Sequence, residues 1–388
     1  MVRGLKPKTR PYSSQSRTNI ESLPDELLWE ILVRVPADDL HDRARVVCRK
    51  WSHIIHSDAF VNSHLHHSSY GIVISAYEPY EPRNRNPIYV SATKQGRIEI
   101  SNKLSCKWRN TAWGSCNGLV LDYLVKATPC ILNPVTKQAF LLPPFDSERV
   151  RVRLCLCGIG YSAASMEYKV VQTHLTPSGP RVMHLAILSV GVDNSWRHVE
   201  VEHLADYVRG LFYYTPLITE GFMHWTSYSH EKVLTMNVET EIITQTNAPT
   251  SIHKYYLSTG RYLTLLIHGG DNLVWEVWEM KPETGEWRMV VQNIKFEGQE
   301  FEQCPCKDDD HHFLFPVGWV EYPKVLVFGV ERGRSCRYYS FNTRYQGCIF
   351  YNVNTREINS PKLPAPSRHY RAFPHRNTLH AMVRLRYG

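Results

Sequence analysis

Residues 304–312 are the part of the chain whose residue types most resemble a metal site. They hold Cys304 and Cys306, followed by three aspartates and two histidines. Zinc sites normally take cysteines separated by two to four residues and a second matched pair of ligands. A single residue separates these two cysteines, and the acids suit a solvated loop. The sequence therefore predicts no metal here.

Other residues capable of chemistry have simpler structural interpretations. Cys155 and Cys157 flank one leucine in an apolar run, so we expect their thiols on opposite faces of a strand, one of them buried. His64, His66 and His67 are expected to be polar residues of a link between domains. The chain has no Gly-rich phosphate loop, dinucleotide fingerprint, Gly-x-Ser-x-Gly elbow or His-Glu-x-x-His motif. We therefore expect no catalytic residues and no cofactor.

Large aromatic side chains are a second group of candidates, because they dominate binding hot spots. The candidates are Trp225, Trp275, Trp278, Trp287, Trp319, Tyr213, Tyr214, Tyr255 and Tyr256. They lie in strand-like runs, where aromatic residues usually fill the core. We expect most of them to be packing residues rather than contacts to a partner.

Composition and charge limit the classes of protein to which this chain can belong. The chain has 388 residues, of which 43% are hydrophobic, enough for a sizeable core. Its longest apolar runs are far shorter than a membrane span. The net charge is +8, but eleven bases lie in two stretches without acids, residues 1–19 and 361–388, which leaves 34 bases against 37 acids elsewhere. A nucleic-acid surface would cluster its bases on the fold, so we expect neither a nucleic acid nor a membrane as partner.

The cysteine usage and the leader indicate the compartment. There are ten cysteines, no apolar secretory segment after the N-terminal bases, and no Asn-x-Ser/Thr sequon. These features favour a reducing compartment with free thiols. We expect the cytoplasm, the nucleus or both.

A helical hydrophobic period covers residues 20–66. Pro24, Asp25 and Glu26 suit the first turn of a helix. The stripe that follows comprises Leu27, Leu28, Ile31, Leu32 and Val35. Pro36 ends this helix, and a second is expected with a face made by Leu40, Ala44, Val47, Cys48 and Trp51, before a last short helix from Asp58. A unit this small rarely buries all its apolar surface, which implies a partner; alternatively, the stripes pack on each other and on the rest of the chain.

This segment closely resembles an F-box. The resemblance is carried by residues 23–36, 40, 45–51, 54–55 and 58–60, in the order typical of that family. The chain departs from the pattern in Arg49-Lys50 before the tryptophan and in Ala37-Asp38-Asp39 after the proline. The resemblance implies docking on a Skp-family adaptor. We assign that surface to Leu23, Pro24, Leu27, Leu28, Ile31, Leu32, Leu40, Val46, Val47, Cys48 and Trp51, without deciding which of them point inward.

From about residue 70 the hydrophobic period changes to that of β-strands. A phrase made of an apolar strand, Asn or Lys, two turn residues and Thr recurs at residues 131–136, 236–240, 280–285 and 351–355. Strands at regular intervals without helices between them predict an all-β sandwich, barrel or propeller. The span is long for a sandwich. At roughly 45 residues per four-stranded blade it fits about seven propeller blades, within a range of five to eight.

The same region resembles the F-box-associated domain of plant F-box proteins. The similar phrases are Ser115-Cys116-Asn117-Gly118-Leu119-Val120, Asn133-Pro134 with Leu142-Pro143-Pro144, Tyr168-Lys169-Val170-Val171, Ser195-Trp196-Arg197, Gly221-Phe222-Met223-His224-Trp225 and Val277-Trp278. They follow one another in the expected order after an F-box. The resemblance implies a kelch-like, propeller-type domain that recognises a substrate.

The predicted fold class is therefore α+β and multidomain. It comprises a disordered basic leader (1–19), a three-helix F-box (20–66), an all-β, propeller-like domain (70–360) and a basic C-terminal tail (361–388). The resemblances imply a substrate-recognition adaptor of an SCF-type cullin–RING ubiquitin ligase. It would bind a Skp-family adaptor, through it the cullin and RING subunits, and an unknown client protein. The alternatives are a propeller-type scaffold without ubiquitin transfer and a propeller enzyme.

Overall fold

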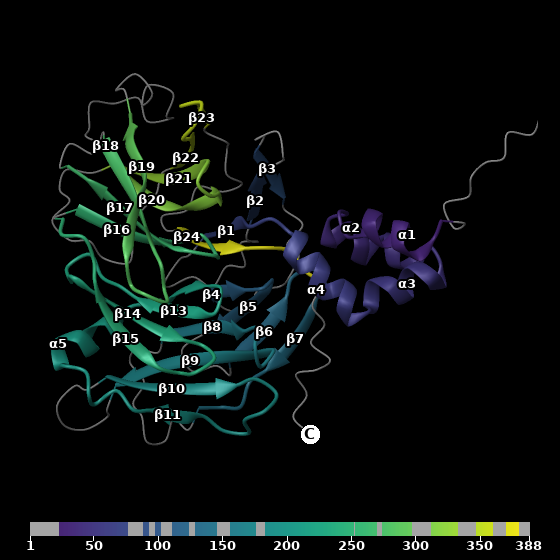
Figure 1. The fold of residues 1–388 in the computed structure, drawn as a ribbon, viewed down its shortest axis with the longest axis horizontal. Helices are drawn as coiled ribbons and strands as arrows, with labels where there is room; N and C mark the ends of the chain where they lie inside the picture. The colour runs from purple at the N-terminus through teal and green to yellow at the C-terminus, as the bar shows by residue number, and fades with distance from the viewer. Residues whose placement is uncertain are drawn as a thin grey trace, which may run out of the picture.

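The structure, a computed structural model, has a small helical domain joined to a much larger domain of strands (Figure 1). It describes residues 23–76, 88–92, 98–101, 111–123, 129–145, 156–175, 183–251, 253–269, 274–296, 312–332, 347–359 and 370–379. The predicted leader and the cysteines at 304 and 306 lie outside these residues. Within them, no helix combines the length and apolarity that crossing a bilayer requires.

Four short helices and a 3-10 turn form the helical domain (residues 23–67). They are α1 (Asp25–Leu32), α2 (Ala37–Asp42), η2 (Ala44–Val46), α3 (Arg49–His56) and α4 (Asp58–His67). Pro24 and Pro36 stand at the N-caps of α1 and α2, where a missing N–H costs nothing. The predicted second helix is divided, because Arg43 leaves helical geometry (φ −124°) and Cys48 is extended (φ −157°). The sequence pattern did not predict this break.

Large apolar side chains from all four helices form the core of the helical domain. Leu28, Leu40 and Phe60 are fully buried. The ring of Trp29 packs edge-on against Phe60, with centroids 5.1 Å apart. The Ser57 hydroxyl accepts a hydrogen bond from the Phe60 N–H and caps α4. The helices therefore pack around one apolar core despite the small size of the unit.

Six four-stranded antiparallel sheets make up the rest of the described chain. The first sheet comprises β24 (Tyr370–His375), β1 (Gly71–Ala76), β2 (Ile88–Ala92) and β3 (Ile98–Ser101). The second comprises β4 (Thr111–Cys116), β5 (Leu119–Tyr123), β6 (Cys130–Asn133) and β7 (Gln138–Leu141). The third comprises β8 (Leu156–Ser162), β9 (Glu167–Leu175), β10 (Met183–Ser189) and β11 (Arg197–Val199). The fourth sheet comprises β12 (Leu217–Thr219), β13 (Phe222–Trp225), β14 (Lys232–Asn237) and β15 (Ile243–Asn247). The fifth comprises β16 (His253–Ser258), β17 (Leu263–His268), β18 (Val274–Met280) and β19 (Trp287–Lys295). The sixth comprises β20 (His312–Glu321), β21 (Val325–Arg332), β22 (Gly347–Asn352) and β23 (Ile358–Asn359). A short helix α5 (Asp206–Arg209) and a 3-10 turn η3 (Gly210–Tyr213) lie between the third and fourth sheets.

The sheets are the blades of a closed propeller. Strands β24, β4, β8, β12, β16 and β20 each contact the next in a ring, and β20 contacts β24. Each of them is the edge strand of its own sheet, so together they line the axis. The predicted propeller is confirmed, with six blades, one fewer than the central expectation of seven.

The first blade joins the first strand of the propeller to its last one. β24 pairs antiparallel with β1 over six residue pairs, from Gly71 with His375 to Ala76 with Tyr370. The prediction of a basic tail over residues 361–388 is therefore wrong for residues 370–379. Arg376, Thr378 and Leu379, which follow β24, are buried. The bases in this stretch do not belong to a free tail.

The recurring sequence phrase corresponds to equivalent turns in different blades. The side-chain oxygens of Asn133, Asn237 and Asn352 each accept hydrogen bonds from the backbone N–H groups two and three residues on. A residue with positive φ follows each turn, Lys137 in the first case and Glu241 in the second. Asparagine closes such turns with its own side chain. These turns between the third and fourth strands of a blade explain the repeat.

Candidate partner-docking surface

One face of α1 leaves apolar side chains in solvent. Leu27 and Ile31 lie one helical turn apart and are 53% and 45% exposed, whereas Leu28 and Leu32, the residues that follow each of them, are buried. Residues four apart share a helix face, so the two exposed side chains form one apolar strip. Lys50 of α3 fixes the start of this helix, because its Nζ lies 2.6 Å from an Asp25 carboxylate oxygen and donates to the Leu23 carbonyl at 2.9 Å.

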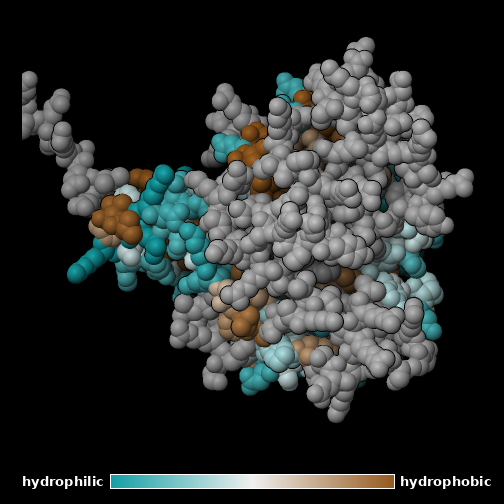
Figure 2. Space-filling view, turned by 180° about the vertical axis from the view of Figure 1, so that it is seen from behind, coloured by the Kyte–Doolittle hydropathy of each residue, from teal (hydrophilic) through white to brown (hydrophobic). Residues whose placement is uncertain are grey.

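A second exposed apolar pair lies between η2 and α3. Val46 and Val47 are 70% and 52% exposed. We refer to Leu27, Ile31, Val46 and Val47 as the exposed apolar set. Figure 2 shows apolar atoms gathered at the end of the helical domain that lies away from the propeller. Covering the exposed parts of these four side chains would contribute on the order of 4 kcal/mol to binding.

The structure divides the eleven residues assigned to the docking surface into three groups. The first group, which is exposed, consists of Pro24 and the exposed apolar set. The second group is half-buried and consists of Leu23, Cys48 and Trp51. Leu28, Leu32 and Leu40 are buried in the core of the helical domain. The structure thus identifies these three leucines as the ones that point inward, where they stabilise the helices that carry the surface.

The sequence predicted that His64, His66 and His67 belong to a link between the domains, and this prediction is wrong. They lie on α4, and His64 is buried. Its Nε2 lies 2.9 Å from the Val35 carbonyl oxygen, to which it donates, and burial lowers its pKa. His66 and His67 are exposed. Because α4 ends at His67 and β1 starts at Gly71, the connection between the domains is very short.

The helical domain is also fixed to the propeller by contacts that the sequence did not predict. Val135, from the β6–β7 turn, and Leu379, which follows β24, belong to the same apolar core as the helices. The side-chain amide of Asn377 donates to an Asp38 carboxylate oxygen at 2.9 Å. These contacts come from segments far apart in the sequence, so no local pattern could have revealed them. They hold the exposed apolar set at a fixed position relative to the blades.

The aromatic candidates mostly lie inside the blades, as expected. Trp225, Trp275 and Trp319 are fully buried, and Trp278 and Trp287 are half-buried against a neighbouring cluster. The tyrosines 213, 214, 255 and 256 are likewise half-buried. This placement favours a packing role for the group.

The buried nucleophiles are held in their neutral forms. Burial raises the pKa of the Cys116 and Cys348 thiols to about 12, so neither is a thiolate at neutral pH. Cys157 is buried in β8, in agreement with the strand prediction, whereas Cys155 lies outside the described residues.

His224 is fully buried between the hydroxyls of Thr219 and Thr235, at 2.9 and 3.0 Å. No cluster of ligands suited to a metal ion occurs in the described part of the chain.

The structure thus combines a helical domain that has an exposed apolar face with a six-bladed propeller, and the two are joined by apolar and polar contacts. Residues 20–62 match the family model of the F-box domain, and residues 66–303 match that of the F-box associated beta propeller domain. The chain therefore belongs to the F-box proteins that carry an F-box-associated β-propeller. The blade closure by β24 lies beyond the matched residues.

Several F-box proteins of Arabidopsis thaliana are similar to this chain in sequence. "F-box protein At1g11270" is 26% identical over 238 residues, which cover 56% of this chain and 73% of that protein. "Putative F-box protein At4g09190" is 26% identical over 235 residues, covering 57% and 58%. The chain thus spans between about half and three quarters of the length of such relatives. Among solved structures, TolB from Acinetobacter baumannii aligns with a TM-score of 0.41 and 9% identity, covering 82% of this chain and 73% of that one.

Proposed function

We propose that this protein is the substrate-recognition adaptor of an SCF-type cullin–RING ubiquitin ligase. The observation that carries the proposal is the exposed apolar set, which a family member with an F-box would use to bind a Skp-family adaptor. A soluble domain rarely leaves large side chains such as Leu27 and Ile31 half-exposed on one helix face unless a partner covers them. The propeller is then the domain that binds the client protein.

The proposed mechanism is positioning rather than catalysis. The adaptor would bring the cullin and RING subunits to the helical domain, while the propeller holds a client. A client lysine held near the ubiquitin-charged enzyme reacts as if at high local concentration. The contacts of Val135, Leu379 and Asn377 support this mechanism, since a fixed angle between the two domains limits where the client can lie.

Co-purification tests this proposal directly. The tagged full chain, expressed with a Skp-family adaptor and a cullin, is expected to retain both partners through gel filtration. A chain that retains neither would favour the alternative of a scaffold without ubiquitin transfer. A propeller enzyme would instead require turnover of a small molecule that is lost when a buried polar residue is replaced. We also propose a location in the cytoplasm, the nucleus or both, which imaging of a fluorescent fusion would test.

A further inference from the structure

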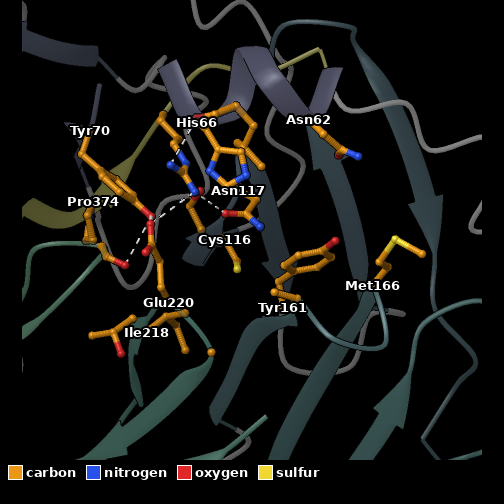
Figure 3. Close-up of a pocket in the computed structure, with 17 residues that line it drawn as sticks. Asn62, His66, Tyr70, Cys116, Asn117, Tyr161, Met166, Ile218, Glu220 and Pro374 are labelled. Carbon is orange, nitrogen blue, oxygen red and sulfur yellow. Dashed lines mark hydrogen bonds and ion pairs between the residues drawn. The ribbon is translucent and has the colours of Figure 1, made fainter. Parts of the chain in front are cut away.

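A cavity of about 390 Å³ lies between α4 and the end of the propeller axis. Its walls come from α4, from the turns that follow the axial strands β4, β8, β12 and β16, and from the end of β24. In Figure 3, Asn62 and His66 of α4 lie on one side, Tyr70 and Pro374 on a second, and Tyr161 opposite them. The cavity has room for about a dozen water molecules, the size of a small organic ligand.

Arg376 is the charged group at the centre of this site. It is only 4% exposed, and its guanidinium stacks on the Tyr70 ring at 4.5 Å. Its two terminal nitrogens donate to the Leu65 carbonyl at 3.2 Å and to the Asn117 side-chain oxygen at 2.7 Å. Its Nε has no hydrogen-bond partner among the described residues. A buried guanidinium with an unused donor costs free energy that an added acceptor would recover.

Among the described residues, the guanidiniums of Arg376 in the cavity lining and Arg261 beside it face one carboxylate, which leaves one positive charge in excess. Glu220 is the only carboxylate among the described residues that line the cavity, and it lies 3.6 Å from Nη2 of Arg376, longer than a hydrogen bond. The same carboxylate also lies 3.5 Å from Nε of Arg261 and accepts a hydrogen bond from Tyr70 at 3.4 Å. The Glu220 carboxylate is therefore shared between the guanidinium groups of Arg376 and Arg261. Its side chain is 43% exposed, so an incoming anion could displace it from Arg376.

The remaining walls combine apolar surface with free donors. Met166 and Ile218 supply apolar atoms. The Tyr161 hydroxyl and the Asn62 amide face the cavity region without a hydrogen bond to the described protein. Cys116 offers a neutral thiol, since burial raises its pKa to about 12. The site thus combines hydrogen-bonding groups with apolar atoms, and Glu220 supplies the carboxylate among its described lining residues.

We propose that this cavity binds a small organic monocarboxylate, with its carboxylate on Arg376 and its apolar body between Tyr161, Met166 and Ile218. A planar guanidinium fork matches a carboxylate, and a single excess charge suits a monoanion better than a phosphate dianion. The proposal is independent of ubiquitin transfer. Because α4 forms one wall, an occupied cavity would also stabilise the joint between the helical domain and the blades.

Ligand-observed NMR on the purified full chain tests the proposal. The probes are hexanoate, 3-phenylpropanoate and 3-cyclohexylpropanoate, each paired with its neutral amide, and phenyl phosphate as the dianion. Ligands of this size are expected to bind at about millimolar concentration or below. At least one acid should bind tenfold or more tightly than its amide and than phenyl phosphate. Occupancy should also slow hydrogen exchange in α4.

Two variants with opposite expected effects locate the binding. Glu220→Gln removes the competing carboxylate and should tighten binding of the acid at least threefold, whereas Glu283→Gln, on the exposed β18–β19 turn, should not change it. Tyr161→Phe should weaken binding about threefold, and Tyr207→Phe on α5 should not. The proposal is overturned if no acid binds at about 10 mM, if acid and amide bind equally, or if Glu220→Gln leaves the affinity unchanged while the variant melts like the wild type.

Discussion

Replacing Leu27 and Ile31 by aspartate together is expected to abolish binding to a Skp-family adaptor while leaving the helical domain folded. Both side chains point to solvent, at 53% and 45% exposure, so the double variant removes little from the core. Aspartate on an exposed helix surface costs only about 0.5 kcal/mol per site in helix propensity. The free energy of unfolding should therefore change by about 1 kcal/mol.

The effect on binding follows from the same exposures. Fully burying a leucine or isoleucine contributes about 2 kcal/mol, so covering the exposed half of each contributes about 1 kcal/mol. Each new carboxylate, covered by an apolar partner without a counter-charge, costs about 1–3 kcal/mol more. The double variant should lose about 4–8 kcal/mol of binding free energy. That is a loss of affinity of about a thousandfold or more.

Isothermal titration of purified chains with the adaptor measures this loss, and circular dichroism checks the fold. The matched control is Leu141→Asp with Ile242→Asp, two apolar residues of the propeller that are 62% and 61% exposed. This control should bind the adaptor like the wild type. If the α1 double variant binds within threefold of the wild type, α1 is not a docking surface and the reasoning fails.

Three further perturbations separate the roles of the core, the blade closure and the buried histidines. Leu28→Ala, at a fully buried position of the same helix, should destabilise the helical domain by about 2–5 kcal/mol; a denaturation midpoint equal to that of the wild type would contradict the core assignment. Deleting residues 370–388 removes β24 from the first blade, so cooperative thermal unfolding of the propeller should be lost; an unchanged melt would show that closure contributes nothing. Burial lowers the pKa of His375 to about 4 and of His224 to about 3, so the unfolded chain binds more protons as pH falls below about 6.5. The free energy of unfolding should be nearly constant between about pH 7 and 8 and fall between about pH 6.5 and 4, by roughly 3 kcal/mol for a residue such as His375; stability independent of pH in that lower window would refute the burial argument.

Features that depend on neighbours in the sequence could be predicted. Pro24 marked the start of α1 and Pro36 the break after it, and the Asn-x-x-Thr phrase marked turns that asparagine side chains close. Alternation is local as well: in β18 Trp275 and Val277 are buried, whereas Glu276 between them is half-buried. In each case the physical cause lies within a few residues.

Features that depend on distant partners could not be predicted. β24 pairs with β1, almost 300 residues earlier in the chain, and its bases made the segment look like a free tail. The stripe on α1 contains both Leu27 and Leu28, and nothing in residue type says which one faces inward. That choice depends on the tertiary core, which includes Val135 and Leu379 from the far domain. The cavity around Arg376 likewise brings together α4, the end of β24 and turns from four other blades, which are far apart in the sequence.

Hydrogen exchange of the full chain, alone and with a Skp-family adaptor, tests the central claim most directly. The account predicts a stoichiometric complex in which protection increases in α1 and around Val46 and Val47, with the turns of the propeller unaffected. Absence of a complex, or protection confined to the propeller, would contradict it.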